Sequence, residues 1–222
     1  MKFSLACIAA LAGFAAAQND VQSKSFKLVL SSDDKSLNGQ ALTACHTGAA
    51  IESLCLTEGG GSKFNFNTTK GDNAQVKGLT PSGKLTFKLV FGKIRVLSHL
   101  SSILCKHELI ESYPGGSPPG SVPEPMSFSI DPSTNVALPL FTPSDSDIQY
   151  VSFEKSSEAM RVVSYIDDTK KPVQTDKSRA LNRWYVCSSN YLGYNYKTLN
   201  WVLGNGKPQN PSCKKVDVKR KF

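Results

Sequence analysis

Histidine is scarce in this chain, with three in 222 residues. Two of them, His99 and His107, fall in one short segment, and the third, His46, follows Cys45 directly. Nucleophilic catalysis of the Ser-His-Asp or Cys-His type needs a histidine within reach of the nucleophile. No Gly-x-Ser-x-Gly elbow is present, and Cys105 and His107 are spaced so that they would lie on different faces of a helix. The sequence therefore predicts no catalytic residue and no enzyme activity.

Motifs for metal ions are also lacking. The chain has no paired Cys-x-x-Cys, no His-Glu-x-x-His and no calcium-loop pattern, so we expect neither a metal nor another cofactor. Glycoside hydrolysis would need two carboxylates held across a cleft. The most visible pair, Asp167-Asp168, follows a strand-like run and precedes a Lys-Lys-Pro sequence, which is typical of a polar turn. A cryptic glycan-active hydrolase is therefore a third hypothesis for the function, after two kinds of binding protein.

Long apolar runs are absent after the first residues, so we expect no membrane span. The beginning itself reads as a secretory signal peptide over residues 1–17. Lys2 supplies a positive charge, Leu5 to Ala16 an apolar stretch, and Ala15-Ala16-Ala17 a small-residue cleavage site. The sequence predicts a secreted, extracellular protein whose single β-rich domain covers residues 18–222. A secreted protein folds where disulfides form and persist.

Five cysteines follow the predicted signal peptide, and an odd number in a secreted protein requires an explanation. Proximity along the chain favours Cys45–Cys55 and Cys187–Cys213 as disulfides, which leaves Cys105 unpaired.

Short strand-like runs account for most of the chain. Apolar and polar residues alternate in many of them, with turn residues such as Asn38-Gly39 between. For residues 49–56 a helix is an alternative, although Gly48 and the cysteine spacing favour a hairpin. We predict an all-β fold, an antiparallel sandwich or barrel-like domain, with a β-trefoil-like fold as the alternative because the strand count allows it. No internal repeat is clear. The expected strands are 25–30, 40–45, 51–56, 63–68, 85–91, 126–130, 136–141, 149–153, 160–166, 183–188, 194–203 and 214–222.

Two segments differ from this pattern. Tyr113 to Pro125 is rich in proline and glycine, and we predict a loop there. Residues 93–110 lose the period of two and contain Cys105. We hypothesise that 93–110 is a doubtful insertion translated from a retained intron; the alternative is an amphipathic helix beside the sheet.

Positive charge is in excess. The net charge is +8, and removal of Lys2 with the signal peptide would leave +7. Much of the excess lies near the end of the chain, but Val216 and Val218 alternate there with charged residues, as in a half-buried strand with a solvated face. We therefore expect no nucleic-acid partner. Asn67-Thr68-Thr69 is a glycosylation sequon, which predicts a glycoprotein modified at an exposed Asn67.

Aromatic residues concentrate near residues 184–201. Strand alternation places Trp184 in the core, and we expect Trp201 there as well. Exposed amphipathic rings suit contact with sugar faces. The candidates for glycan binding are Tyr191, Tyr194 and Tyr196, the first two beside Gly193 in an expected loop.

Several segments also carry a resemblance: Leu37-Asn38-Gly39, Ala44 to Ala50, Leu54-Cys55-Leu56, Arg183 to Cys187, Tyr196 to Gly204 and Pro208 to Cys213. With these segments the chain resembles a family of uncharacterised secreted proteins of filamentous fungi, and its layout is similar to that of phialide-type fungal cell wall proteins. The resemblance covers most of the chain after the signal peptide except about residues 92–120, and it implies no established activity or catalytic residue.

Our leading expectation is a non-enzymatic secreted protein of the cell wall or extracellular space that binds a cell-wall polysaccharide. A secreted effector or antigen that binds a host protein is the second hypothesis. The sequence leaves the oligomeric state open.

Overall fold

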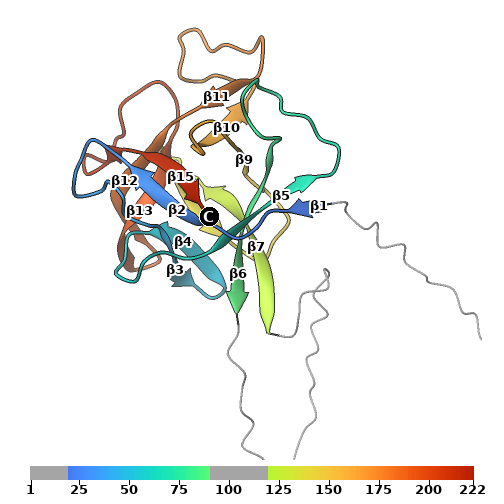
Figure 1. Cartoon of the computed structure of the whole chain (residues 1–222). Coiled ribbons are helices and arrows are strands. Elements are labelled where there is room, and N and C mark those ends of the chain that lie inside the picture. The colour runs from blue at the N-terminus through green and yellow to red at the C-terminus, as the bar shows by residue number, and fades with distance from the viewer. Residues whose placement is uncertain (1–19, 91–119) are drawn as a thin grey trace, which may run out of the picture.

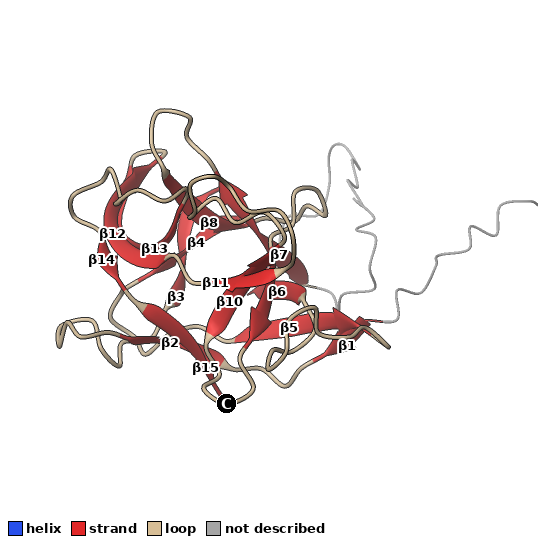
Figure 2. Ribbon diagram, turned by 90° about the horizontal axis from the view of Figure 1, so that it is seen from above, coloured by secondary structure: helices blue, strands red, loops and turns tan. Residues whose placement is uncertain are grey.

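The computed structural model describes residues 20–90 and 120–222, and every regular element in them is a β-strand. Figure 2 shows strands and loops without a helix in this part of the chain. All strand pairs are antiparallel, as predicted. The strands are β1 (Asp20–Gln22), β2 (Lys27–Ser31), β3 (Thr43–Gly48), β4 (Ile51–Cys55), β5 (Phe64–Thr69), β6 (Gly83–Val90), β7 (Ser121–Ser129), β8 (Val136–Phe141), β9 (Tyr150–Phe153), β10 (Met160–Ser164), β11 (Arg179–Leu181), β12 (Trp184–Tyr191), β13 (Tyr194–Val202), β14 (Lys214–Lys215) and β15 (Asp217–Lys221).

A six-stranded barrel forms the centre of the fold. Its strands pair in the order β2-β5-β6-β9-β10-β15, and β15 pairs back to β2. Two of the contacts are isolated bridges, Phe26 with Phe64 and Ala159 with Lys219. In Figure 1 the first and last barrel strands, β2 in blue and β15 in red, lie side by side. Closure of the ring gives each of these strands a partner on both sides, which removes exposed sheet edges.

Three hairpins cap the barrel. They are β3–β4, β7–β8 and β12–β13, and one strand of each pairs with the other two: β4 with β8, β8 with β13, and β13 with β4. Six barrel strands and three mutually paired hairpins are the arrangement of a β-trefoil. Within the predicted all-β class, the topology therefore corresponds to the β-trefoil-like fold, the predicted alternative.

Alternating apolar residues of these strands fill the interior. Inside the barrel the ring of Phe153 packs edge to face against two others, with its centroid 5.6 Å from that of Phe26 and 5.1 Å from that of Phe66. Trp184 and Trp201 are buried as predicted, with centroids 4.8 Å apart. Val216 and Val218 are buried as well, which confirms the half-buried strand expected near the end of the chain.

The loop prediction for Tyr113 to Pro125 is wrong from Ser121 onward, where β7 begins. Pro123 pairs with Lys88 and Pro125 with Thr86 of β6, whereas β8 pairs with β7 only from Met126. Proline lacks the N–H that a second neighbour would need, so it is tolerated where a strand has one partner. The predicted hairpin of strands 40–45 and 51–56 is confirmed over its helical alternative, with its strands at Thr43–Gly48 and Ile51–Cys55.

Both predicted disulfides, Cys45–Cys55 and Cys187–Cys213, are present. The first links the two strands of hairpin β3–β4. The second links β12 to the segment just before β14, and so ties the end of the chain to the cap.

We expect the double variant Cys187→Ala/Cys213→Ala to lose about 3 kcal/mol of unfolding free energy, because the disulfide restricts the unfolded chain. Cys45→Ala/Cys55→Ala should lose about 1 kcal/mol less, since its cysteines are 10 residues apart instead of 26. Denaturant unfolding of the two variants beside the unmodified protein measures both values. An unchanged unfolding midpoint for either variant would contradict this account.

Candidate functional site

The tyrosines singled out by the sequence meet at the tip of hairpin β12–β13. Tyr191 ends β12, Tyr194 begins β13, and the two are directly paired. Leu192 and Gly193 form the turn between them, with φ angles of 48° and 87°. Positive φ at both central positions is the geometry of a type I′ turn, which matches the twist of the flanking strands. The tyrosines therefore flank a two-residue turn as strand residues, and the expected loop is limited to that turn.

Two of the rings form a parallel pair. Tyr194 and Tyr196 are two positions apart on β13 and so point to the same face. Their centroids are 6.4 Å apart and their planes differ by 5°. The imidazole of His46, from hairpin β3–β4, contacts Tyr194 edge to face at 5.4 Å. We call His46, Tyr194 and Tyr196 the aromatic row.

The aromatic row is accessible to solvent. Tyr194 and His46 are exposed, and Tyr196 and Tyr191 are half-buried. Sequence reasoning considered His46 only as a catalytic base and missed its place here. The pairing of β4 with β13 places hairpin β3–β4 next to hairpin β12–β13 and so brings His46 to Tyr194. No local pattern in the sequence indicates that contact.

Buried polar groups hold the base of the hairpin in register. The hydroxyl of Thr198 lies 2.7 Å from Ser189 Oγ and 2.7 Å from Asn200 Oδ1. Thr198 and Asn200 follow Tyr196 on the same face of β13, and Ser189 is the residue paired with Tyr196. A hydrogen-bonded cluster of this kind keeps the aromatic row on a rigid support.

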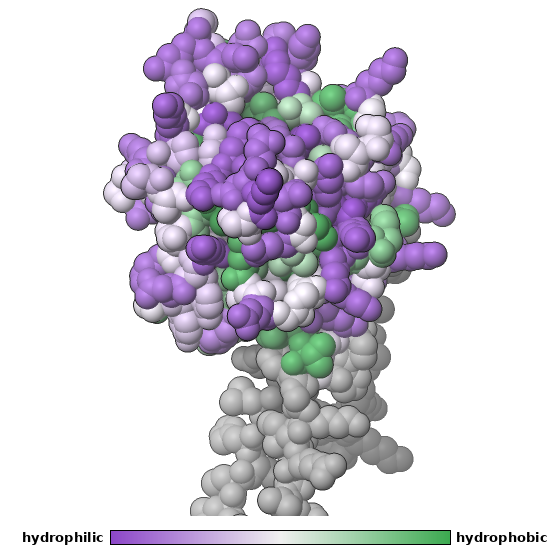
Figure 3. All heavy atoms as spheres, turned by 60° about the vertical axis from the view of Figure 1, so that its left-hand side comes forward, coloured by the Kyte–Doolittle hydropathy of each residue, from purple (hydrophilic) through white to green (hydrophobic). Residues whose placement is uncertain are grey.

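A shallow hollow of about 420 Å³ lies on hairpin β12–β13, where strand alternation points the side chains of Asn190, Asn195 and Lys197 to the face opposite the aromatic row. Tyr196 and Lys197 line it together with two amide side chains, Asn190 and Asn195. Asn190 Nδ2 donates a hydrogen bond to Asn195 Oδ1 at 2.9 Å, which orients both amides. The hollow thus presents amide and ammonium groups on the face opposite the aromatic row. Figure 3 shows that this side of the molecule is largely hydrophilic, with small apolar patches.

Glu52 of β4 and Glu124 of β7 are a pair of acids that the sequence did not connect. Both are buried, and Glu124 is 0% exposed. Burial and the facing Glu52 carboxyl raise the pKa of Glu124 to about 9. A carboxyl group that solvent does not reach has no contact with a polysaccharide on the surface. We therefore assign this pair to the core.

Asp167 and Asp168 lie in the loop after β10. Asp167 is buried and accepts hydrogen bonds from the backbone N–H and hydroxyl of Thr169, which lower its pKa. Asp168 Oδ2 accepts from the backbone N–H of Gly204 at 2.5 Å. Both carboxylates therefore order loops.

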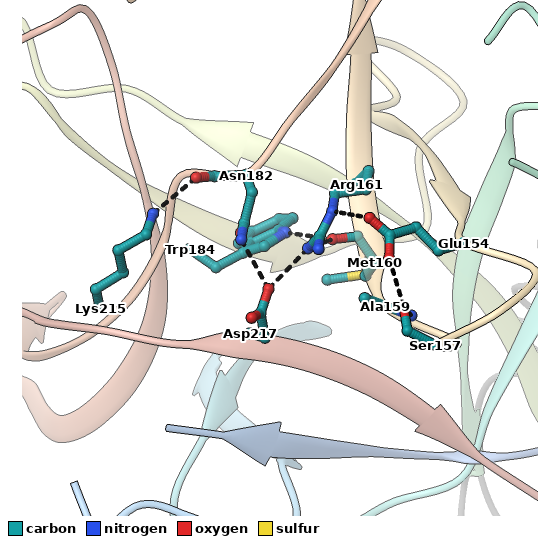
Figure 4. A network of polar contacts seen from close by, with 9 residues as sticks. All are labelled: Glu154, Ser157, Ala159, Met160, Arg161, Asn182, Trp184, Lys215 and Asp217. Atoms are coloured by element: carbon teal, nitrogen blue, oxygen red, sulfur yellow. Dashed lines mark hydrogen bonds and ion pairs between the residues drawn. The ribbon is translucent and has the colours of Figure 1, made fainter. Parts of the chain in front are cut away.

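A polar network joins β10, β12 and β15 (Figure 4). Arg161 donates to Glu154 Oε1 and to Asp217 Oδ1, both at 2.8 Å, and Asn182 donates to the same atom of Asp217 at 2.7 Å. Lys215 Nζ donates to the carbonyl of Asn182 at 2.8 Å. Burial, with Arg183 nearby, lowers the pKa of Lys215. Because the groups of this network contact one another within the fold, we infer that the network holds the last strand, β15, in place.

Asn67 lies in the middle of three paired strands, between Gln22 of β1 and Lys84 of β6. Its side chain is half-buried, and Nδ2 lies 3.4 Å from Thr86 Oγ1. Glycosylation at Asn67 stays a prediction.

Several predictions lie outside the described residues. These are the signal peptide over 1–17, the doubtful insertion at 93–110, and the roles of Cys105, His99 and His107. Within residues 20–90 and 120–222, no helix has the length and apolar character needed to cross a membrane. The same residues contain no group of three or more His, Cys, Asp or Glu side chains placed to hold a metal ion.

Comparison with known proteins gave one match. A family model described as a domain of unknown function (DUF7907) matches residues 23–102. No curated protein and no solved structure matches the chain. The matched region includes β2 to β6 and His46, whereas hairpin β12–β13 lies beyond it. The match is consistent with an uncharacterised domain family and assigns no activity.

Proposed function

We propose that the protein is a secreted, non-enzymatic binder of polysaccharide in the cell wall or extracellular space, and that the aromatic row is its binding surface. The observation that carries the proposal is the parallel pair of rings at the tip of a rigid hairpin, with Tyr194 exposed and Tyr196 half-buried. Sugars combine apolar C–H faces with hydroxyl groups, so their sites combine aromatic rings with a few oriented polar groups.

The imidazole of His46 lies edge to face against Tyr194 and supplies a polar group beside the rings. The amides of Asn190 and Asn195 lie on the opposite face of the hairpin.

The experiment is retention of the purified protein on insoluble chitin, β-glucan and mannan at low and high salt. We expect retention that resists salt on at least one polymer, and about tenfold or greater loss of affinity in Tyr194→Ala/Tyr196→Ala, because two ring contacts are removed. Release of soluble sugar in the same assay would instead identify a hydrolase.

Tyr150→Ala/Tyr165→Ala is the matched control, since both tyrosines are exposed and lie outside hairpin β12–β13. Its retention should equal that of the unmodified protein. Absence of retention, or retention abolished by salt alone, would overturn the proposal and favour a protein partner.

A further inference from the structure

A second hollow, of about 580 Å³, lies where the first and last barrel strands meet. Phe26 contributes to its floor. Three lysines and one exposed aromatic ring surround it: Lys27, Lys63, Lys221 and Phe222. We call it the lysine cleft. Its volume falls in the range of sites for small ligands.

The charged side chains that line the lysine cleft are all lysines. No aspartate or glutamate side chain lines it. Lys27 Nζ donates to the carbonyl of Gly60 at 2.6 Å, which holds its ammonium group at the cleft. Lys63 and Lys221 are exposed, and neither has an ion pair among the described residues. By contrast, nearby Arg220 is paired with Glu158. Concentrated unpaired charge in a concave surface attracts anions.

An aromatic ring is fixed at the edge of the same cleft. Phe222 is 69% exposed, yet its ring packs edge to face on Phe26 at 5.8 Å. The guanidinium of Arg220 lies over the rings of Phe153 and Phe222, 4.6 and 5.4 Å from their centroids. Arg220 is itself oriented by Glu158. The exposed side of the Phe222 ring is therefore held in one place as a contact surface.

We propose that the lysine cleft binds an acidic sugar unit, carboxylated or sulfated, with its anionic group on Lys63 and Lys221 and its ring against Phe222. A lysine ammonium group is a compact charge and, unlike a guanidinium group, does not require a planar anion. It can therefore bind either a carboxylate or a sulfate group. Three cations confined to one hollow match a unit with one or two negative charges, whereas a long polyanion would need an extended basic stripe. This site is separate from the aromatic row and does not depend on it.

The test is calorimetric titration of the full chain with three probes: a galacturonate trisaccharide, a sulfated heparin disaccharide and neutral cellotriose. We expect binding of the uronate, the sulfated sugar or both, and none of cellotriose in the lysine cleft. Comparison of the two acidic probes identifies which anion the site takes. Lys63→Gln/Lys221→Gln should lower the affinity about tenfold or more, since each removed charge contributes directly to an anion contact.

Lys177→Gln/Lys207→Gln is the control of equal charge, because both lysines are exposed and lie outside the cleft. It should bind as the unmodified protein does. Phe222→Ala should weaken binding even at high salt, where the charge contribution is screened. Tyr194→Ala/Tyr196→Ala should leave acidic-sugar affinity unchanged, which separates this proposal from the proposed function. Equal losses in both lysine variants, or no binding of either acidic probe at about 1 mM, would overturn it.

Discussion

Replacement of Glu124 by glutamine is expected to stabilise the protein at pH 8 and to remove much of the pH dependence of its stability. Glu124 is 0% exposed and faces Glu52, and neither of its carboxyl oxygens has a hydrogen-bond partner. A buried group of this kind is costly in its charged form. Glutamine keeps the shape of the protonated acid and cannot ionise.

The pKa values of Glu124 in the unfolded and folded states determine how its contribution to stability changes with pH. In the unfolded chain Glu124 titrates near 4.5, and in the folded protein its pKa is about 9. Between these values the folded state retains a proton that the unfolded state has lost. The contribution of Glu124 to stability is therefore greatest below pH 4.5 and falls as the pH rises toward 9, by up to about 1.4 kcal/mol per pH unit.

Denaturant unfolding at pH 5 and pH 8 measures the effect. Glu124→Gln should exceed the unmodified protein in unfolding free energy by about 1–4 kcal/mol at pH 8, within the limit set by about 1.4 kcal/mol per pH unit above pH 4.5. The difference should be much smaller at pH 5. Glu58→Gln is the control, since Glu58 is exposed, and it should shift neither value. Equal stability of Glu124→Gln and the unmodified protein at pH 8 would contradict the prediction.

Trp184→Ala is expected to cost about 3–5 kcal/mol of unfolding free energy, the range for removal of a large buried aromatic side chain. The indole packs against Trp201 at 4.8 Å and Phe128 at 6.0 Å, and its Nε1–H donates to the carbonyl of Met160 at 3.1 Å (Figure 4). The substitution removes all three contacts and leaves a cavity between the cap and the barrel.

Two further variants define the source of the loss. Trp184→Phe keeps a ring but not the hydrogen bond, so it should cost less than Trp184→Ala. Tyr165→Ala removes a ring that is 60% exposed and should change stability by less than about 0.5 kcal/mol. A loss below about 1 kcal/mol in Trp184→Ala, measured by urea unfolding, would show that the cap does not depend on this residue.

Most strands could be predicted because each depends on a local pattern. Val216 and Val218 alternate with charged residues, and alternate positions on a strand point to opposite faces, so their burial follows directly. The two disulfides could be predicted because their cysteines are close in the chain. Strands β1 and β11, three residues each, were missed because so short a segment shows no alternation.

The candidate site could be predicted in part. Tyr191, Tyr194 and Tyr196 share one hairpin, so their proximity is a property of local sequence. His46 joins them from 148 positions before Tyr194, and Glu52 meets Glu124 across 72 positions. Neither pair has a sequence signal, because side chains from different hairpins meet only once the cap has formed.

The sequence by itself determined the all-β class, most of the strands with their buried faces, and the proximity of the three tyrosines, since each depends on neighbours within a few residues. Only the tertiary structure decided that β2 pairs with β15, that three hairpins form a trefoil cap, and that Lys27, Lys63 and Lys221 surround one cleft. Those contacts join distant segments. They depend on how the whole barrel closes around its apolar interior, and short-range alternation contains no information about which strand becomes the partner of another.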